Sequence, residues 1–278
     1  MDTVQDHYDS HNLSQRIQNA LEESGKDIGA ILPKDLAAVD QLHTGGAAAT
    51  LGLMAKAKVS KKNTPSQDIH ILDAGCGIGG SARLLCKTFP CRVTGIDLAA
   101  SFIETARELT SLCNLAHCIE FEQGSVLEMP FENDSFDAIL CQHILMNIQD
   151  KEAALKEFYR VLKPGKVLIL HEIFQGKNRE IALPVPWASD PCISFLLPWE
   201  EFDSLLVGTG FLPDHFSDET NSALSWWEMV QAAGINKPPR PLSPHLVFGS
   251  NAAFFATNMQ CNFKNNSIQC IEAIYKKS

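Results

Sequence analysis

From residue 69 onward, apolar and polar positions follow a pattern that predicts strands and helices in alternation. Short runs rich in Ile, Val, Leu and Phe have the length of strands that are buried on both faces. The strands are expected at Ile69–Leu72, Cys91–Asp97, Ile119–Gln123, Phe136–Cys141, Lys166–Glu172, Phe211–Phe216 and Ser267–Tyr275. Each of the earlier strands is followed by a stretch with helical periodicity, which is typical of a parallel α/β sheet.

The last expected strand, at the end of the sequence, has the pattern of an interior strand. Ser267–Tyr275 carries apolar residues on both faces, as an interior strand does. We expect it to insert antiparallel near one edge. The fold class predicted is α/β, with a seven-stranded, mostly parallel sheet whose last strand is antiparallel.

Helical segments are expected between the strands and ahead of them. Those after the first strand are Ser81–Lys87, Ala99–Leu112, Glu152–Leu162, Trp199–Val207, Ala223–Ala233 and Leu246–Met259. In the first sixty residues Leu13, Ile17 and Leu21 recur at helical spacing, and Gly25 ends that run. Further on, Gly45–Gly46 is either an inter-helix turn or a backbone surface that closes on a ligand.

The helical start and the polar segment Lys61–Ser66 suggest a division of the chain. We expect an N-terminal helical cap at residues 1–62 and the α/β domain at 63–278. Two insertions, at about residues 175–197 and 219–266, have the composition of lids. The first contains Ala182–Pro198, whose prolines and aromatics indicate a lid over a pocket or a packed Ω-loop.

Composition narrows the classes of partner and compartment. The 278 residues have a net charge of −10 and no dense Lys/Arg run, so nucleic acid and anionic membranes are not expected partners. No apolar stretch approaches the ~20 residues of a membrane span. The N-terminus lacks the pattern of a signal peptide. Nine cysteines without a C-x-x-C pair suit reduced thiols in a cytoplasm, and neither disulfides nor a metal site is expected.

Candidate chemistry begins at the turn after the first strand. Gly75, Gly77, Gly79 and Gly80 lie between that strand and a helix, where glycines allow close backbone approach and helix N–H groups face a ligand. The spacing also fits G-x-G-x-x-G, a weak dinucleotide pattern. Asp73 changes that interpretation, because a carboxylate suits a ligand with a positive group better than a pyrophosphate. S-adenosylmethionine carries an ammonium and a sulfonium but no phosphate.

Later strand ends supply the remaining candidate ligand contacts. Asp97, followed by Leu98, ends the second strand about twenty residues after the glycine turn, where a carboxylate can accept both ribose hydroxyls. The segment Gly124, Ser125 and Val126 follows the third strand, where an adenine ring is expected. Ligands of open α/β sheets lie beyond the carboxyl ends of strands, which places Gln142 and His143 for chemistry.

The string Asp73–Gly79 and the segment Glu157–Gly165 resemble the core of class I S-adenosylmethionine-dependent methyltransferases. The resemblance covers Ile69 to about Leu170, and it is to the small-molecule branch that includes sarcosine/dimethylglycine N-methyltransferases and quinone C-methyltransferases. It implies a Rossmann-like sheet, bound S-adenosyl-L-methionine and in-line methyl transfer to an amine nitrogen or to a quinol or aromatic carbon or oxygen. The cofactor-binding set expected is Asp73, Gly75, Gly77, Gly79, Asp97, Leu98, Gly124, Ser125, Val126, Gln142 and Gly46.

A base would assist methyl transfer to either an amine or a carbon acid. His143 is the first candidate, Glu172 at the end of the fifth strand the second, and His43 the third. Tyr8 is a further catalytic candidate, since phosphoethanolamine methyltransferases pair an N-terminal tyrosine with a later histidine. The position of that histidine is occupied here by Asn147.

Two other functions remain open at this point. Tyr159 and Lys163 fit the Tyr-x-x-x-Lys spacing of short-chain NAD(P)-dependent reductases, although Pro164 ends the helix directly after that lysine. A non-catalytic S-adenosylmethionine-binding regulator is the second alternative. The partner expected is a small-molecule acceptor, with the chain a monomer or homodimer.

Overall fold

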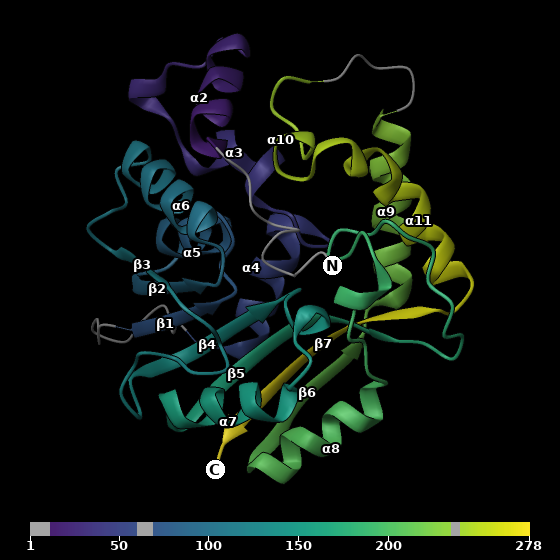
Figure 1. The fold of residues 1–278 in the computed structure, drawn as a ribbon. Helices are drawn as coiled ribbons and strands as arrows, with labels where there is room; N and C mark the ends of the chain where they lie inside the picture. Colours follow the sequence, from purple (N-terminus) through teal and green to yellow (C-terminus); the bar gives the residue numbers. More distant parts are fainter. Residues whose placement is uncertain (1–11, 60–68, 235–239) are drawn as a thin grey trace.

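A seven-stranded sheet organises the computed structural model, which describes residues 12–59, 69–234 and 240–278. The strands are β1 (Ile69–Ala74), β2 (Cys91–Asp97), β3 (Ile119–Gln123), β4 (Phe136–Gln142), β5 (Leu162–Gln175), β6 (Phe211–Asp218) and β7 (Ile268–Lys277). Their order is β3-β2-β1-β4-β5-β7-β6, and β7 alone runs antiparallel to its neighbours (Figure 1). The predicted α/β fold is confirmed. The last strand is interior, as its two apolar faces indicated.

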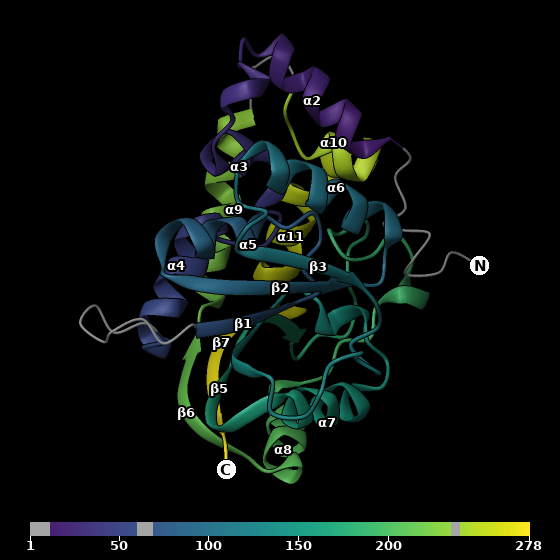
Figure 2. The same ribbon diagram turned by 90° about the vertical axis from the view of Figure 1, so that its left-hand side faces the viewer.

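Both faces of the sheet are apolar, because successive side chains of a strand point to opposite sides. In β5, Val167 and Ile169 pack in one core cluster, whereas Leu168 and Leu170 pack in the other. Helices α2, α3 and α6 stack beyond β2 and β3 on one side, and α7 and α8 lie on the other (Figure 2). Their bounds are α2 (Leu13–Glu23), α3 (Pro33–Asp40), α4 (Gly46–Ala57), α5 (Gly80–Thr88), α6 (Ala100–Leu112), α7 (Lys151–Val161) and α8 (Trp199–Thr209).

The C-terminal helices differ in one respect from the prediction. The expected continuous helix Leu246–Met259 is wrong: α10 (His245–Phe248) ends at Gly249, a 3-10 turn follows, and α11 (Ala252–Lys264) continues beyond the expected end. Gly249 has φ +58° and ψ −145°, a conformation that glycine adopts readily and that interrupts the helix. Helix α11 packs beside α9 (Thr220–Gly234) (Figure 1).

The segment ahead of the sheet forms helices that pack on the same side as α5 and α6. Residues Gly45 and Gly46 form a turn between α3 and α4, with φ values of +79° and +54°. That is the first of the two possibilities raised for this pair. The boundary expected at Lys61–Ser66 lies outside the described residues, so the division into cap and domain remains a proposal.

The proline- and aromatic-rich insertion packs against the C-terminal helices. Val185, Trp187 and Ile193 are buried in a third cluster together with Trp227 and Phe255. This cluster covers the carboxyl end of β5 and the start of β7. No helix among the described residues is long and apolar enough to cross a membrane.

Candidate active site

A cavity of about 800 Å³ opens at the carboxyl ends of the parallel strands, where ligands of such sheets bind. It is lined by the glycine turn after β1, the ends of β2 and β3, the segment after β4, the α3–α4 loop, the insertion and α10. Ten of the residues expected to bind a cofactor or act in catalysis line it: Asp73, Gly75, Gly77, Asp97, Leu98, Gly124, Ser125, Val126, Gln142 and His143. His43, the third candidate base, lines it as well.

Glycine is required at the turn for two physical reasons. Gly75 has φ +67°, and a Cβ there would lie 2.1 Å from Cγ2 of Ile144. A Cβ on Gly80 would lie 2.0 Å from the carbonyl oxygen of Asp40. Gly77 also has a positive φ, but nothing lies within 4 Å of a Cβ at that position. The turn therefore keeps backbone exposed to the cavity.

Two carboxylates line the cavity at this turn, the buried Asp73 and the partly buried Asp97. Asp97 accepts hydrogen bonds from the N–H groups of Gly77 (2.9 Å) and Ala99 (3.0 Å), whereas Oδ2 of Asp73 is buried without a partner among the described residues. Burial, and then the negative charge of Asp97, raises the pKa of Asp73 to about 7. Burial also raises the pKa of Asp97. A ligand with a positive group and several donors would satisfy both side chains.

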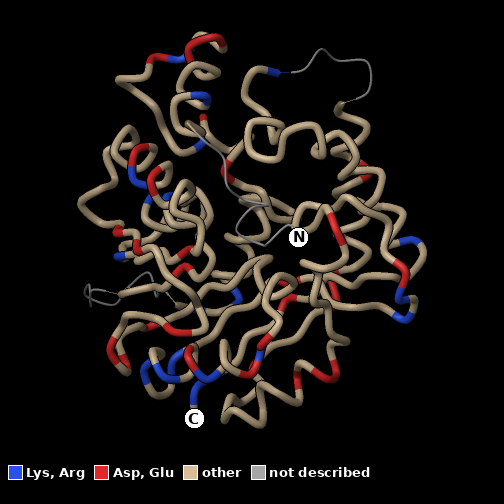
Figure 3. Tube along the Cα trace, in the orientation of Figure 1, with Lys and Arg blue, Asp and Glu red and all other residues tan. Residues whose placement is uncertain are grey.

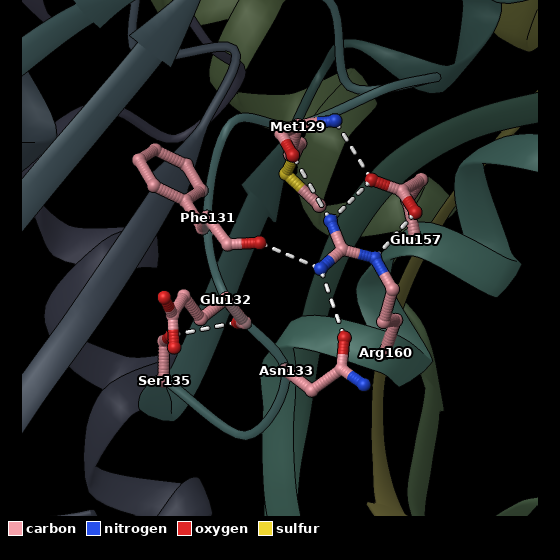
Figure 4. Close-up of polar contacts among 7 residues, drawn as sticks. All are labelled: Met129, Phe131, Glu132, Asn133, Ser135, Glu157 and Arg160. Carbon is pink, nitrogen blue, oxygen red and sulfur yellow. Dashed lines mark hydrogen bonds and ion pairs between the residues drawn. The ribbon is translucent and has the colours of Figure 1, made fainter.

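The segment after β3 forms another wall and is held by an arginine. Arg160 of α7 donates to the carbonyl oxygens of Phe131 (2.6 Å) and Met129 (3.0 Å) and pairs with Glu157 (Figure 4). Glu157 in turn accepts from the N–H of Met129 (2.7 Å). The loop that begins at Gly124 is thereby fixed to α7, which gives the resemblance at Glu157–Gly165 a structural basis. Ser125 Oγ accepts from the N–H of Leu127.

Opposite these carboxylates lies a cluster of uncharged polar side chains. The ring of His143 lies 6.2 Å from that of His43 and 4.9 Å from that of His171, measured between centroids. Gln142 Oε1 accepts from Thr50 Oγ1 (3.1 Å). Thr50 also contacts Nε2 of His43 (2.9 Å), so the α3–α4 region is tied to the end of β4.

Burial keeps these imidazoles neutral. It lowers the pKa of His43 to about 4 and that of His171 to about 3, and it holds the pKa of His143 well below the usual value. His143 has φ +55°, an uncommon left-handed conformation for a residue other than glycine. Its Nε2 is buried and has no hydrogen-bond partner in the described part of the chain. Such residues cluster at functional sites.

Three expected site residues do not line the cavity, and a fourth lies outside the described residues. Glu172 is fully buried and does not line the cavity; it accepts hydrogen bonds from the N–H groups of Ile144 (3.0 Å) and Leu145 (3.2 Å). It therefore holds the segment after β4 from behind. Gly79 and Gly46 do not line the cavity either, and the carbonyl of Gly46 instead contacts Nε2 of His43 (3.0 Å). Tyr8 lies outside the described residues.

The strand order assembles one set of potential metal ligands that the sequence spacing did not indicate. Ligand atoms of His143, His171 and Cys270 all lie within 4.8 Å of one another. Cys270 Sγ and Nε2 of His171 already contact each other at 3.3 Å. His143 directly follows β4, and His171 and Cys270 lie in the neighbouring strands β5 and β7. The three residues are far apart in the sequence, so no linear motif indicated them.

The spacing that suggested a reductase has a structural explanation. Tyr159 packs edge-to-face on Phe211, and Lys163, already in β5, forms an ion pair with Asp137 (2.8 Å). Neither residue lines the cavity. The reductase alternative therefore lacks its catalytic pair at this site.

Among the cavity residues that the sequence did not predict, three large apolar side chains stand out. Trp187, Phe248 and Met146 line the cavity, from the insertion, from α10 and from the turn after β4. Asn147, seen in the sequence only as a departure from a related pattern, fixes the insertion by donating to the carbonyl oxygens of Trp187 (2.7 Å) and Ile193 (2.9 Å). The aromatic composition of residues 182–198 was the available signal.

Comparison with known proteins agrees with this geometry. The methyltransferase domain family matches residues 72–170, the stretch that runs from β1 through most of β5 and contains the glycine turn, Asp97 and His143. Residues 72–170 form a methyltransferase domain. The curated relatives of this chain are named for different acceptors. Glycine/sarcosine/dimethylglycine N-methyltransferase of Actinopolyspora halophila is 38% identical over 104 residues, which are 37% of this chain and 18% of that protein.

A longer match is 2-methyl-6-phytyl-1,4-hydroquinone methyltransferase of Synechocystis sp., 34% identical over 178 residues, or 60% of this chain and 55% of that protein. The chain thus spans less than two thirds of the length of either relative. Geranyl diphosphate C-methyltransferase from Streptomyces coelicolor A3(2), solved with Mg²⁺, geranyl-S-thiolodiphosphate and S-adenosyl-L-homocysteine, has the same fold. Its TM-score is 0.66 at 19% identity, covering 84% of this chain and 76% of that one.

Proposed function

We propose that this chain transfers a methyl group from S-adenosyl-L-methionine to a small-molecule acceptor. The observation that carries the proposal is the buried, unpartnered Oδ2 of Asp73 beside the exposed backbone of the glycine turn. An unsatisfied buried carboxylate oxygen calls for a donor or cation from a ligand. Asp97 lies across the turn with its remaining lone pairs available for hydroxyl groups.

The described residues fit this cofactor. Asp73 would hold its ammonium, Asp97 its ribose hydroxyls, and the backbone of Gly75 and Gly77 would approach the ligand without side-chain interference. Leu98, Gly124, Ser125 and Val126 would form the adenine wall, and Gln142 would border the transferred group. The cofactor, when bound, supplies a methyl group on a sulfonium, an activated leaving group that needs no protein nucleophile.

The protein's own contribution is then mainly to position the acceptor. Trp187 and Phe248 narrow the cavity and limit water, and alignment of reacting groups can supply up to ~7–11 kcal/mol. His143, whose pKa is held well below its usual value by desolvation and which is therefore neutral, would hold the acceptor or take its proton, a role that adds ~10²–10⁴-fold. Glu172 acts behind His143 as a positioning residue, since it fixes the segment that carries the imidazole.

Binding of the cofactor can be tested before any acceptor is known. Calorimetry should show binding of S-adenosylmethionine and S-adenosylhomocysteine and negligible binding of NADPH. Asp97→Ala removes charge-assisted hydrogen bonds of about 1.5–3 kcal/mol, so affinity should fall roughly 10- to 150-fold. Asp137→Ala, a carboxylate at the opposite end of β4, is the matched control. Tight NADPH binding, or unchanged affinity in Asp97→Ala, would contradict the proposal.

A non-catalytic binding protein is the alternative. It would bind the cofactor with the same dependence on Asp97 but release no S-adenosylhomocysteine with any acceptor. We further propose that the protein is a cytoplasmic monomer or homodimer. We also propose that it has no nucleic-acid partner, which the net charge of −10 supports. Light scattering during size-exclusion chromatography, with and without duplex DNA, tests these points.

A further inference from the structure

The cavity has two chemically different walls, and the strand order separates them. The ends of β1, β2 and β3 carry Asp73 and Asp97. The segment after β4, with the α3–α4 loop, the insertion and α10, forms the other wall. The residues of this second wall used below are His43, His143, Met146, Asn147, Trp187 and Phe248. If the first wall holds the cofactor, the second faces the acceptor.

The acceptor wall carries no cation among the described residues, and its two carboxylates are either paired or exposed at the rim. The ionisable carboxylates that line the cavity are Asp40, Asp73, Asp97 and Asp150, and no described Lys or Arg lines it. Asp40 is neutralised by the buried Arg83 (3.1 Å), and Asp150 is exposed at the rim, where it caps α7 by accepting from Ala153. A carboxylate or phosphate placed at this wall would lose its hydration without gaining a cation.

Four lysines that could have served an anionic acceptor lie at the opposite end of the strands. Lys151 directly follows the cavity segment after β4, but its ammonium donates to the carbonyl oxygens of Ile148 and Phe195. Figure 3 shows basic positions gathered around the C-terminus. Lys163 and Lys166 pair there with Asp137, and Lys276 and Lys277 with other aspartates. These lysines stand at the amino end of β5 and the carboxyl end of β7, away from the cavity.

The polar groups of the acceptor wall suit an uncharged hydroxyl. Both Nδ2 hydrogen bonds of Asn147 are used by the insertion. The imidazoles of His43 and His143 remain. Nε2 of His43 already contacts the carbonyl oxygen of Gly46 and Thr50 Oγ1, so Nδ1 is its nitrogen left for an acceptor, and the neutral imidazole of His143 can donate or accept. Around them lie an indole, a phenyl ring and a thioether, which pack well on a flat ring. Trp187 is held in place through Nε1, which donates to Ser194 Oγ (3.0 Å).

We propose that the methyl acceptor is an uncharged aromatic hydroxyl compound, a phenol or hydroquinone, methylated at its oxygen or an adjacent ring carbon. This rests on the proposed function. Transfer forms a bond from that oxygen or carbon to the methyl carbon, and the carbon–sulfur bond breaks with its electron pair left on sulfur. The proton lost by the acceptor passes to His143. Amino-acid and phosphorylated acceptors are excluded by the same wall.

Pairs of probes that share a ring and differ by one charged group test the proposal. We would titrate hydroquinone and 2,5-dihydroxybenzoate, then 4-ethylphenol and tyramine, into the protein saturated with S-adenosylhomocysteine, together with sarcosine and phosphoethanolamine. Each uncharged probe should bind at least 10-fold more tightly than its charged partner, and neither aliphatic probe should compete. Equal or tighter binding of a charged probe, or no binding of either uncharged one, overturns the proposal.

Two variants carry the test further. Phe248→Arg adds a cation at the cavity, whereas Phe254→Arg adds one on exposed surface of α11, where the native side chain is 55% exposed. Phe248→Arg should narrow or reverse the preference for hydroquinone over 2,5-dihydroxybenzoate, and Phe254→Arg should leave it unchanged. Folding of both is checked by thermal melting, and the wild-type probe pairs remain decisive if Phe248→Arg does not fold. If the wild-type protein does not bind S-adenosylhomocysteine, that result counts against the proposed function rather than against the choice of acceptor.

Discussion

Two aspartates set the electrostatics of the cofactor wall at the scale of single residues. Each ends a parallel strand, and burial raises the pKa of both. Asp97 is partly satisfied by backbone N–H groups, but Asp73 keeps one oxygen without a partner in the described structure. The two side chains therefore differ in what they need from a ligand: a cation at Asp73 and neutral donors at Asp97.

The raised pKa of Asp73 predicts how cofactor affinity depends on pH. With a pKa of about 7 in the free protein, the carboxyl is largely protonated at pH 5.5 and must ionise to pair with an ammonium. Affinity should therefore rise with pH, by up to about 10-fold per unit below pH 7, and level off above it. Calorimetry of S-adenosylhomocysteine binding between pH 5.5 and 7.5 measures this. Asp73→Asn should bind more weakly and lose most of the slope, and an unchanged slope would assign the titration elsewhere.

His143 is the other residue whose chemistry can be isolated. Removal of its imidazole in His143→Ala should lower single-turnover rate about 10²–10³-fold, with cofactor affinity within a few-fold of wild type. His143→Asn is the matched variant, because Asn tolerates the left-handed backbone at this position. If His143 mainly orients the acceptor, His143→Asn should restore part of the single-turnover rate. If His143 takes the proton, His143→Asn should restore none of it. A folded His143→Ala protein with near-normal rate would move the role to His43.

At the scale of elements, the residues at strand ends could be predicted from the sequence. The residues that hold the neighbouring segments in place could not. Asp73, Asp97 and His143 follow apolar runs, so parallel topology alone brings them to one edge. Glu172 also ends a predicted strand, yet its side chain does not face the cavity. It lies behind the segment after β4, an arrangement that depends on tertiary packing. The cavity residues Trp187 and Phe248 come from insertions whose position depends on tertiary contacts rather than on local periodicity.

The turn after β4 depends on Glu172. Its carboxylate accepts from the N–H groups of Ile144 and Leu145 and from the thiol of Cys141. Glu172→Gln replaces one acceptor oxygen by a donor that faces backbone N–H, so stability should fall by about 1–3 kcal/mol. Glu152→Gln, on the exposed face of α7, should change stability little. Thermal and urea unfolding measure both, and equal stability of the two variants would show that Glu172 is not the clamp.

The whole molecule depends on its last strand more than its position in the sequence suggests. β7 pairs with β5 along nine registered positions and with β6 on its other side, so it joins the methyltransferase core to the edge strand. Its end is fixed as well, because Lys277 donates to the carbonyl oxygen of Leu162 (2.7 Å). An edge strand could be lost with local fraying, but an interior strand cannot.

Deletion of residues 267–278 should therefore give aggregated or unfolded protein. The truncation would expose the hydrogen-bonding edges of β5 and β6 and leave two apolar faces uncovered. Ile274→Ala tests the same strand more gently: this fully buried side chain should contribute about 2–5 kcal/mol, measured by urea unfolding. Lys276→Ala, whose ion pair with Asp214 is half exposed, is the control and should change stability by less than about 1 kcal/mol. A truncated protein that stays soluble and melts cooperatively would mean that the sheet is stable without β7.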